Sequence, residues 1–224
     1  MSSTDTDQRI RTIKADLRAM MNGVASAAMR EAGLTQDYRV NFGVELPRLK
    51  EMAEELRHEL AEEQAEQQAE NPTEQPAAGT LHSSLCSLLS PLSQALWHER
   101  VRECRILALL LYPAERMEAD LAQEWAADIR QVELAQLAAL LLFCHIPDAG
   151  HCAFQWIASS EDIRQILGYY TLVHLLRQHP LAPRSQQELA DQAATALTSG
   201  NLQLVRAARC ALQAAETDAT EKEL

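Results

Sequence analysis

The sequence predicts an all-α protein built as a superhelix of stacked helix pairs. Three tryptophans, Trp97, Trp125 and Trp156, each stand near the end of a helical stretch, at spacings of 28 and 31 residues. Each is followed within 12 residues by a dense apolar run. A degenerate repeat of this length is typical of stacked helix pairs. Such repeats bury a continuous core only by stacking on their neighbours, which leaves a concave surface for a ligand.

Composition supports helices throughout the chain. Apolar residues make up 47% of the sequence, and the 224 residues include only seven glycines and eight prolines. Ala, Leu, Glu and Gln dominate, and these residues favour helix. No alternating strand pattern appears. The composition therefore favours helix and gives no sign of a sheet.

The predicted elements follow in order. Residues 6–32 form a helix broken near Asn22-Gly23, with Gly33 as its carboxyl-terminal cap. Pro47 fits the first turn of the next helix. Four helix pairs come after it: 84–98 with 100–112, 115–128 with 131–145, 150–158 with 161–178, and 185–198 with 201–215. We predict a single repeat domain over 1–215, an acidic flexible insertion at about 61–82, and a disordered acidic tail at 216–224.

The net charge of −12 is unevenly distributed along the chain. Residues 51–77 carry nine Glu and one Arg, whereas residues 78–215 carry ten Arg and 13 acids. The repeat body is therefore close to neutral, which leaves phosphate binding open if the arginines share one face. The acidic segment is either a solvated insertion or a docking tail for a basic partner.

The five cysteines are expected to be buried, reduced thiols of a cytoplasmic protein. The amino terminus lacks the apolar core of a signal peptide, and no apolar run approaches the length of a membrane helix. Cys144, His145, His151 and Cys152 flank one turn, but their spacing matches no usual zinc motif. We therefore predict no metal, no cofactor and no membrane association.

Arginines near or within the second helix of each pair are the candidate nucleic-acid contacts, since the second helices usually line the concave side of such a solenoid. Arginine binds phosphate through a planar fork. The candidates are Arg102, Arg105, Arg130, Arg164, Arg206 and Arg209. The alternative is that these arginines are solvated side chains on helices and bind no ligand. Acids near the tryptophans are a further candidate site, since an aromatic ring beside a carboxylate can hold a cationic ligand. The alternative is that the tryptophans are core residues and the acids are solvated or interact with the helix dipole.

Three segments resemble the AlkD-type DNA alkylation repair proteins. The connector 42–50 (Phe-Gly-Val-Glu-Leu-Pro-Arg-Leu-Lys) is similar to the family's Gly-(Ile/Val)-x-x-Pro entry signature. Leu96-Trp97 with Arg102-Glu103, and Trp156-Ile-Ala-Ser159, resemble two later segments, so the resemblance covers about residues 10–178. It implies a HEAT-like or armadillo-like, right-handed α–α superhelix of about five to six helix pairs. It also implies DNA as the ligand of the concave face.

The resemblance fails where the family places its chemistry. Those enzymes excise cationic alkylated bases with an aromatic pair, an Asp at the start of one helix and an Arg on the next repeat. Residues 128–135 of this chain contain no aromatic residue, and Ala135 stands near the Asp position. Asp128 and Glu133 are the candidate substitutes. The family Arg falls on Ile166, and Arg164 is about 200° away around a helix. The resemblance therefore implies that base excision is lost.

We thus predict a HEAT-like protein that binds DNA through its concave face without excising bases. The first alternative is a protein-interaction scaffold, which the acidic segment favours. The second alternative is an active glycosylase for cationic alkylated bases. DNA and a protein are the candidate partners. A monomer is the expected state.

Overall fold

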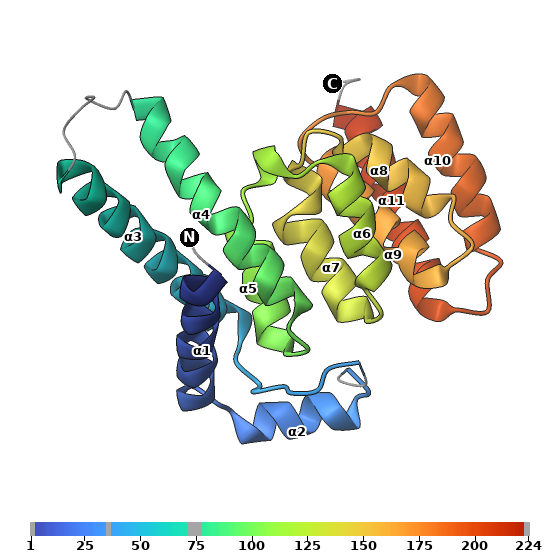
Figure 1. Cartoon of the computed structure of the whole chain (residues 1–224). Helices are drawn as coiled ribbons and strands as arrows, with labels where there is room; N and C mark the ends of the chain where they lie inside the picture. Colours follow the sequence, from blue (N-terminus) through green and yellow to red (C-terminus); the bar gives the residue numbers. More distant parts are fainter. Residues whose placement is uncertain (1–2, 35–36, 71–77, 222–224) are drawn as a thin grey trace. The chain divides into compact units, whose positions relative to one another are not determined.

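The computed structural model describes residues 3–34, 37–70 and 78–221 (Figure 1). Over these residues the secondary structure is helical, apart from an isolated backbone bridge between Val40 and Val101. The all-α prediction is confirmed. The chain divides into two compact units, Met1–Arg116 and Met117–Leu224. The single domain over 1–215 and the handedness of the superhelix depend on how these units are arranged, and both stay predictions.

The first unit contains five α-helices and one 3-10 helix within its described residues. They are α1 (Ser3–Ala19), α2 (Gly23–Glu31), α3 (Leu46–Glu70), α4 (Ala78–His98), α5 (Arg102–Leu111) and η1 (Ala114–Arg116). Ile13 and Leu17 of α1 are buried, as are Leu49 and Leu60 of α3. α4 packs against α5, and α3 packs against both. The apolar stripes predicted for the first helices therefore face a core.

The predicted break near Asn22 is confirmed. The Asn22 side chain caps α2 by accepting a hydrogen bond from the Ala25 backbone N–H at 3.0 Å. At the other end, Gly33 has a φ of 74°. Its N–H donates to the Arg30 carbonyl, and the Leu34 N–H donates to the Met29 carbonyl. These two bonds form the helix-ending motif that favours glycine, so Gly33 caps α2 as expected.

The predicted flexible insertion at 61–82 is wrong over most of its length. α3 continues to Glu70 and α4 begins at Ala78, while residues 71–77 lie outside the described residues. Ala, Glu and Gln have high helix propensity, so the helix persists after its apolar stripe ends. An ion pair between Arg9 of α1 and Glu63 also ties this part of α3 to the rest of the unit.

Three helix pairs make up the second unit. They are α6 (Ala119–Asp128) with α7 (Val132–Leu141), α8 (Ala149–Ile157) with α9 (Asp162–Leu176), and α10 (Pro183–Ala196) with α11 (Leu202–Glu221), and η2 (Phe143–His145) follows α7. α9 packs against both α7 and α11. The second helices of the three pairs therefore form one continuous layer, which we call the second-helix layer.

The predicted disorder from residue 216 is wrong for 216–221, because α11 continues to Glu221. Residues 222–224 lie outside the described residues. No glycine or proline interrupts this stretch. Within the described residues, no helix has the length and apolar character needed to cross a membrane.

Candidate nucleic-acid interface

The connector 42–44, which carries the family signature, is anchored by a buried carboxylate. Glu103 in the first turn of α5 has no exposed surface. Its two carboxylate oxygens accept hydrogen bonds from the backbone N–H groups of Phe42 at 3.1 Å, Gly43 at 2.9 Å and Val44 at 3.3 Å. A buried carboxylate is tolerated only when it is paired and hydrogen-bonded in this way. Glu103 thus joins α5 to the segment that leads into α3.

Arg102 belongs to the same buried network, so its assignment as a nucleic-acid contact is wrong. The residue is 3% exposed. Its Nη1 donates to the Val44 carbonyl at 3.2 Å and lies 3.3 Å from Glu103 Oε1. A guanidinium buried in an ion pair cannot reach a phosphate without disrupting the fold. The motif Arg102-Glu103 is therefore structural in this unit.

The tryptophans are core residues, which was the alternative to a role in ligand binding. Trp97, Trp125 and Trp156 are at most 1% exposed. The Arg105 guanidinium lies over the Trp97 ring, 5.1 Å from its centroid. Trp156 donates its indole N–H to Gln123 Oε1 at 2.7 Å and packs against Phe143. None of the three rings is available as a platform for a ligand.

A pocket opens on the second-helix layer of the second unit. It has a volume of about 840 Å³ and is lined from α7, α9 and α11, including Leu140, Tyr170, His174, Arg177 and Gln213. Burial, followed by the charge of Arg177, lowers the pKa of His174. The histidine is therefore neutral near pH 7. Arg177 is the fixed positive charge of this pocket.

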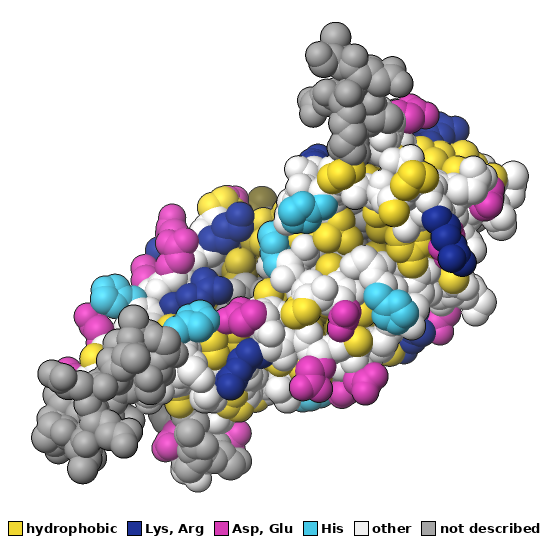
Figure 2. Space-filling view, turned by 90° about the horizontal axis from the view of Figure 1, so that it is seen from above, with side chains coloured by type: hydrophobic (Ala, Val, Ile, Leu, Met, Phe, Trp, Pro, Cys, Tyr) yellow, Lys and Arg dark blue, Asp and Glu magenta, His cyan; other side chains and the backbone are white. Residues whose placement is uncertain are grey.

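The two sets of helices in the second unit differ in charge. The second helices α7, α9 and α11, with Arg177 directly after α9, carry four arginines and five acids, three of these acids in the last turns of α11. The first helices, α6, α8 and α10, carry one arginine and five acids. Arginines are thus more numerous on the second helices, which also form the pocket, while the number of acids is the same on both sets. On the face of the molecule that Figure 2 shows, the Lys and Arg side chains are interspersed with acids.

The remaining candidate arginines differ in their surroundings. Arg130 is exposed after α6, and Arg206 and Arg209 are exposed on α11. Arg206 lies one turn before the pocket residue Cys210, so both occupy one face of the helix. Arg164 is partly exposed, and its Nε lies 3.6 Å from Glu161 Oε2. These four residues stay candidates for phosphate contacts.

The candidate acids of an excision site, Asp128 and Glu133, are distinct from the acid in the described ion pair of Arg164. Asp128 and Glu133 are both partly exposed. The described ion-pair partner of Arg164 is Glu161, which directly precedes α9. Ala135, near the position where the family carries its Asp, is completely buried.

The cysteine–histidine turn at 144–152 is not a metal cluster. Cys144 and Cys152 are buried, whereas His145 and His151 are exposed. Burial raises the pKa of Cys144 to about 11 and also raises that of Cys152. His151 instead lies 2.9 Å from the Gln155 side chain. The thiols are packed groups, as expected.

A different group of possible metal ligands lies in the first unit, where sequence reasoning missed it. His82 and Cys86 of α4 meet Glu115 of η1, with their ligand atoms within 4.8 Å of one another. The four-residue interval between His82 and Cys86 was the available signal, because it places both on one helix face. Only the tertiary structure brings Glu115, 29 residues further on, beside them.

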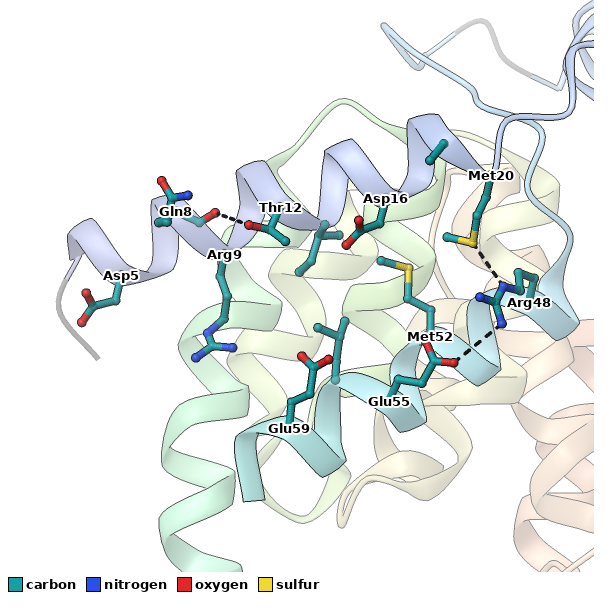
Figure 3. Close-up of a pocket in the computed structure, with 13 residues that line it drawn as sticks. Asp5, Gln8, Arg9, Thr12, Asp16, Met20, Arg48, Met52, Glu55 and Glu59 are labelled. Atoms are coloured by element: carbon teal, nitrogen blue, oxygen red, sulfur yellow. Dashed lines mark hydrogen bonds and ion pairs between the residues drawn. The ribbon is translucent and has the colours of Figure 1, made fainter. Parts of the chain in front are cut away.

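A second pocket lies between α1 and α3 of the first unit (Figure 3). It has a volume of about 600 Å³, and Ile13, Met52 and Leu56 are its buried apolar residues. Its other lining residues include four acids and two arginines: Asp5, Asp16, Glu55, Glu59, Arg9 and Arg48. Both arginines form ion pairs with glutamates. The pocket therefore combines an apolar base with negative charge.

Helix pairs of this kind define the HEAT-like helical-repeat class, and a comparison with solved structures supports that assignment. One solved structure aligns with 95% of this chain and 79% of its own chain, with a TM-score of 0.70 and 13% identity. It is described as belonging to a new family of proteins related to the HEAT-like repeat DNA glycosylases with affinity for branched DNA structures. No protein-family model and no curated protein matches the sequence. The resemblance inferred from the sequence is thus confirmed for the fold.

Proposed function

We propose that this protein binds DNA through the second-helix layer of its second unit and does not excise bases. The observation that carries the proposal is the charge difference between the two sets of helices. Four arginines lie on or directly after the helices that form the pocket, whereas the first helices carry one arginine and an equal number of acids. The DNA affinity described for the structurally similar family supports the same ligand.

Phosphate contacts would come from the exposed arginines of this layer. Arg177 lines the pocket, and Arg206 and Arg209 are exposed on α11. Each phosphate contact adds about −0.9 to the slope of log K against log salt for duplex DNA. With about three contacts and a net charge of −12, binding is expected to be weak at physiological salt and measurable at low ionic strength.

A branched DNA is the preferred ligand in this proposal. The structurally similar family has affinity for branched structures. Sparse arginines contact backbone positions without reading bases, so they suit recognition by shape more than by sequence. A four-way junction should therefore bind more tightly than a linear duplex of the same composition. Equal affinity for both would remove this part of the proposal.

Loss of charge in the second-helix layer should weaken DNA binding without unfolding the protein. We expect the double variant Arg177→Gln/Arg206→Gln to bind a fluorescent junction more weakly and to reduce the salt slope by about 2. The matched control is Arg184→Gln, an exposed arginine on α10, a first helix. Titrations at several salt concentrations provide the measurement. If the double variant keeps the wild-type slope, the proposed face is incorrect.

A protein-interaction scaffold is the second candidate, because the α1–α3 pocket favours a basic partner. Its apolar base and acidic residues are complementary to an amphipathic helix with Lys and Arg on its polar face. We expect a synthetic helical peptide of that kind to bind. The double variant Glu55→Lys/Glu59→Lys should weaken its binding at least tenfold, through a slower association rate whose electrostatic part is screened by salt. The control is Glu124→Lys, because Glu124 is an exposed residue of α6. Fluorescence anisotropy measures the affinity of each variant for the peptide. Equal affinities of the double variant and the Glu124→Lys control would argue against this pocket.

A further inference from the structure

His82, Cys86 and Glu115 form a compact cluster of three chemically different ligand atoms. His82 Nε2 lies 2.8 Å from Glu115 Oε1, and Cys86 Sγ lies 3.3 Å from the same oxygen. The Cys86 Sγ to His82 Nε2 distance is 3.6 Å. The cluster therefore offers imidazole nitrogen, sulfur and carboxylate oxygen around one point.

The fold holds these three residues together through separate elements. His82 and Cys86 are one turn apart on α4, and Glu115 belongs to η1, directly after α5. The Arg116 side chain donates to Ser87 Oγ at 3.1 Å, and Tyr112 Oη donates to the Arg116 carbonyl at 3.3 Å. The first bond joins η1 to α4, and the second holds η1 to the end of α5, so the backbone that carries Glu115 is positioned next to α4.

The ligand spacing is close to that of a tetrahedral zinc ion. Bonds of about 2.0–2.3 Å at tetrahedral angles place ligand atoms roughly 3.4–3.6 Å apart. The two distances that involve Cys86 already approach this range. Only the His82–Glu115 distance has to open, by roughly 0.6 Å on that geometry.

We propose that His82, Cys86 and Glu115 form a three-ligand site for Zn²⁺, with a water molecule as the fourth ligand. Imidazole, thiolate and carboxylate are all zinc ligands, and three protein ligands leave one position open. The His82 and Glu115 side chains are 69% and 54% exposed, so an ion can enter from solvent. Cys86 is buried beneath them. Binding replaces the thiol proton with zinc, and that proton is released to solvent.

Zinc would link α4 to η1 in the bound protein. Without the ion, the three groups form a hydrogen-bonded cluster only. Because the folded chain brings the ligands together from two elements, binding should stabilise the folded state in proportion to zinc concentration. This gives a readout that is independent of any DNA binding.

The site is tested with the full chain after chelator treatment. We expect one Zn²⁺ per chain by calorimetry, and a rise in the unfolding temperature on adding zinc. His82→Gln and Glu115→Gln, both at exposed positions, should each weaken zinc binding at least about tenfold. Co²⁺ in place of zinc should give a sulfur-to-cobalt charge-transfer band, which Cys86→Ser should abolish.

Two substitutions serve as controls for nonspecific binding. His58→Gln removes an exposed histidine that pairs with Glu62 at 3.7 Å, and Cys210→Ser removes a partly exposed thiol on α11. Both should bind zinc like the wild type. Absence of stoichiometric zinc, or wild-type affinity in His82→Gln and Glu115→Gln, would overturn the proposal and leave only the hydrogen-bonded cluster.

Discussion

Replacing Glu103 with alanine is expected to lower the free energy of unfolding by about 3–5 kcal/mol, the range for breaking a buried ion pair. The substitution leaves the Arg102 guanidinium without its buried carboxylate. It also removes the acceptor for the backbone N–H groups of Phe42, Gly43 and Val44. Chemical denaturation monitored by circular dichroism measures the loss.

The matched control for this prediction is Glu31→Ala. Glu31 is an exposed glutamate at the end of α2, and its loss should change stability by no more than about 0.5 kcal/mol. Glu103→Gln should be intermediate, since the amide keeps one oxygen acceptor but brings two donors and no charge. If Glu103→Ala unfolds at the wild-type denaturant concentration, the carboxylate does not anchor the connector.

Gly43→Ala is expected to lower the free energy of unfolding by about 3 kcal/mol. Gly43 has a φ of 73°, a conformation that costs other residues about 1–3 kcal/mol. A Cβ atom at this position would also lie 2.4 Å from the Asn22 carbonyl oxygen and 2.6 Å from the Ser26 nitrogen. Both are backbone atoms, so the clash cannot be relieved by turning a side chain.

Gly23→Ala provides the opposite result in the same unit. Gly23 opens α2, and a Cβ there would meet no atom within 4 Å. Alanine favours helix over glycine, so stability should rise by up to about 1 kcal/mol. Thermal unfolding of the two variants side by side checks both signs. A neutral Gly43→Ala would mean that the connector can move away from α2.

Local sequence signals predicted the helices well because they depend on neighbours along the chain. Asn22 and Gly33 stand at the two ends of α2, where the capping hydrogen bonds join residues no more than five positions apart in the sequence. The buried stripe of α1 follows from the three- and four-residue spacing of Ile10, Ile13 and Leu17. The structure continues α3 to Glu70 and α11 to Glu221, where the apolar pattern has ended. At 61–70 the high helix propensity of Ala, Glu and Gln accounts for this continuation.

The candidate site was less predictable because it depends on contacts between distant segments. Arg102 has the residue type of a phosphate contact, and nothing in its neighbours reveals that Val44 and Glu103 enclose it. Likewise, the spacing of His82 and Cys86 does not reveal Glu115. Arg164 and Glu161, by contrast, pair over three residues, a contact that helix geometry alone allows.

The sequence by itself determined the all-α class and the helix pairs, because apolar periodicity and helix propensity are properties of short segments. The tertiary structure alone decided which polar residues are buried and which ligand atoms meet. Burial of Arg102 and assembly of the His82–Cys86–Glu115 cluster require elements far apart in the chain to pack together. Desolvation and ligand geometry arise only from that packing.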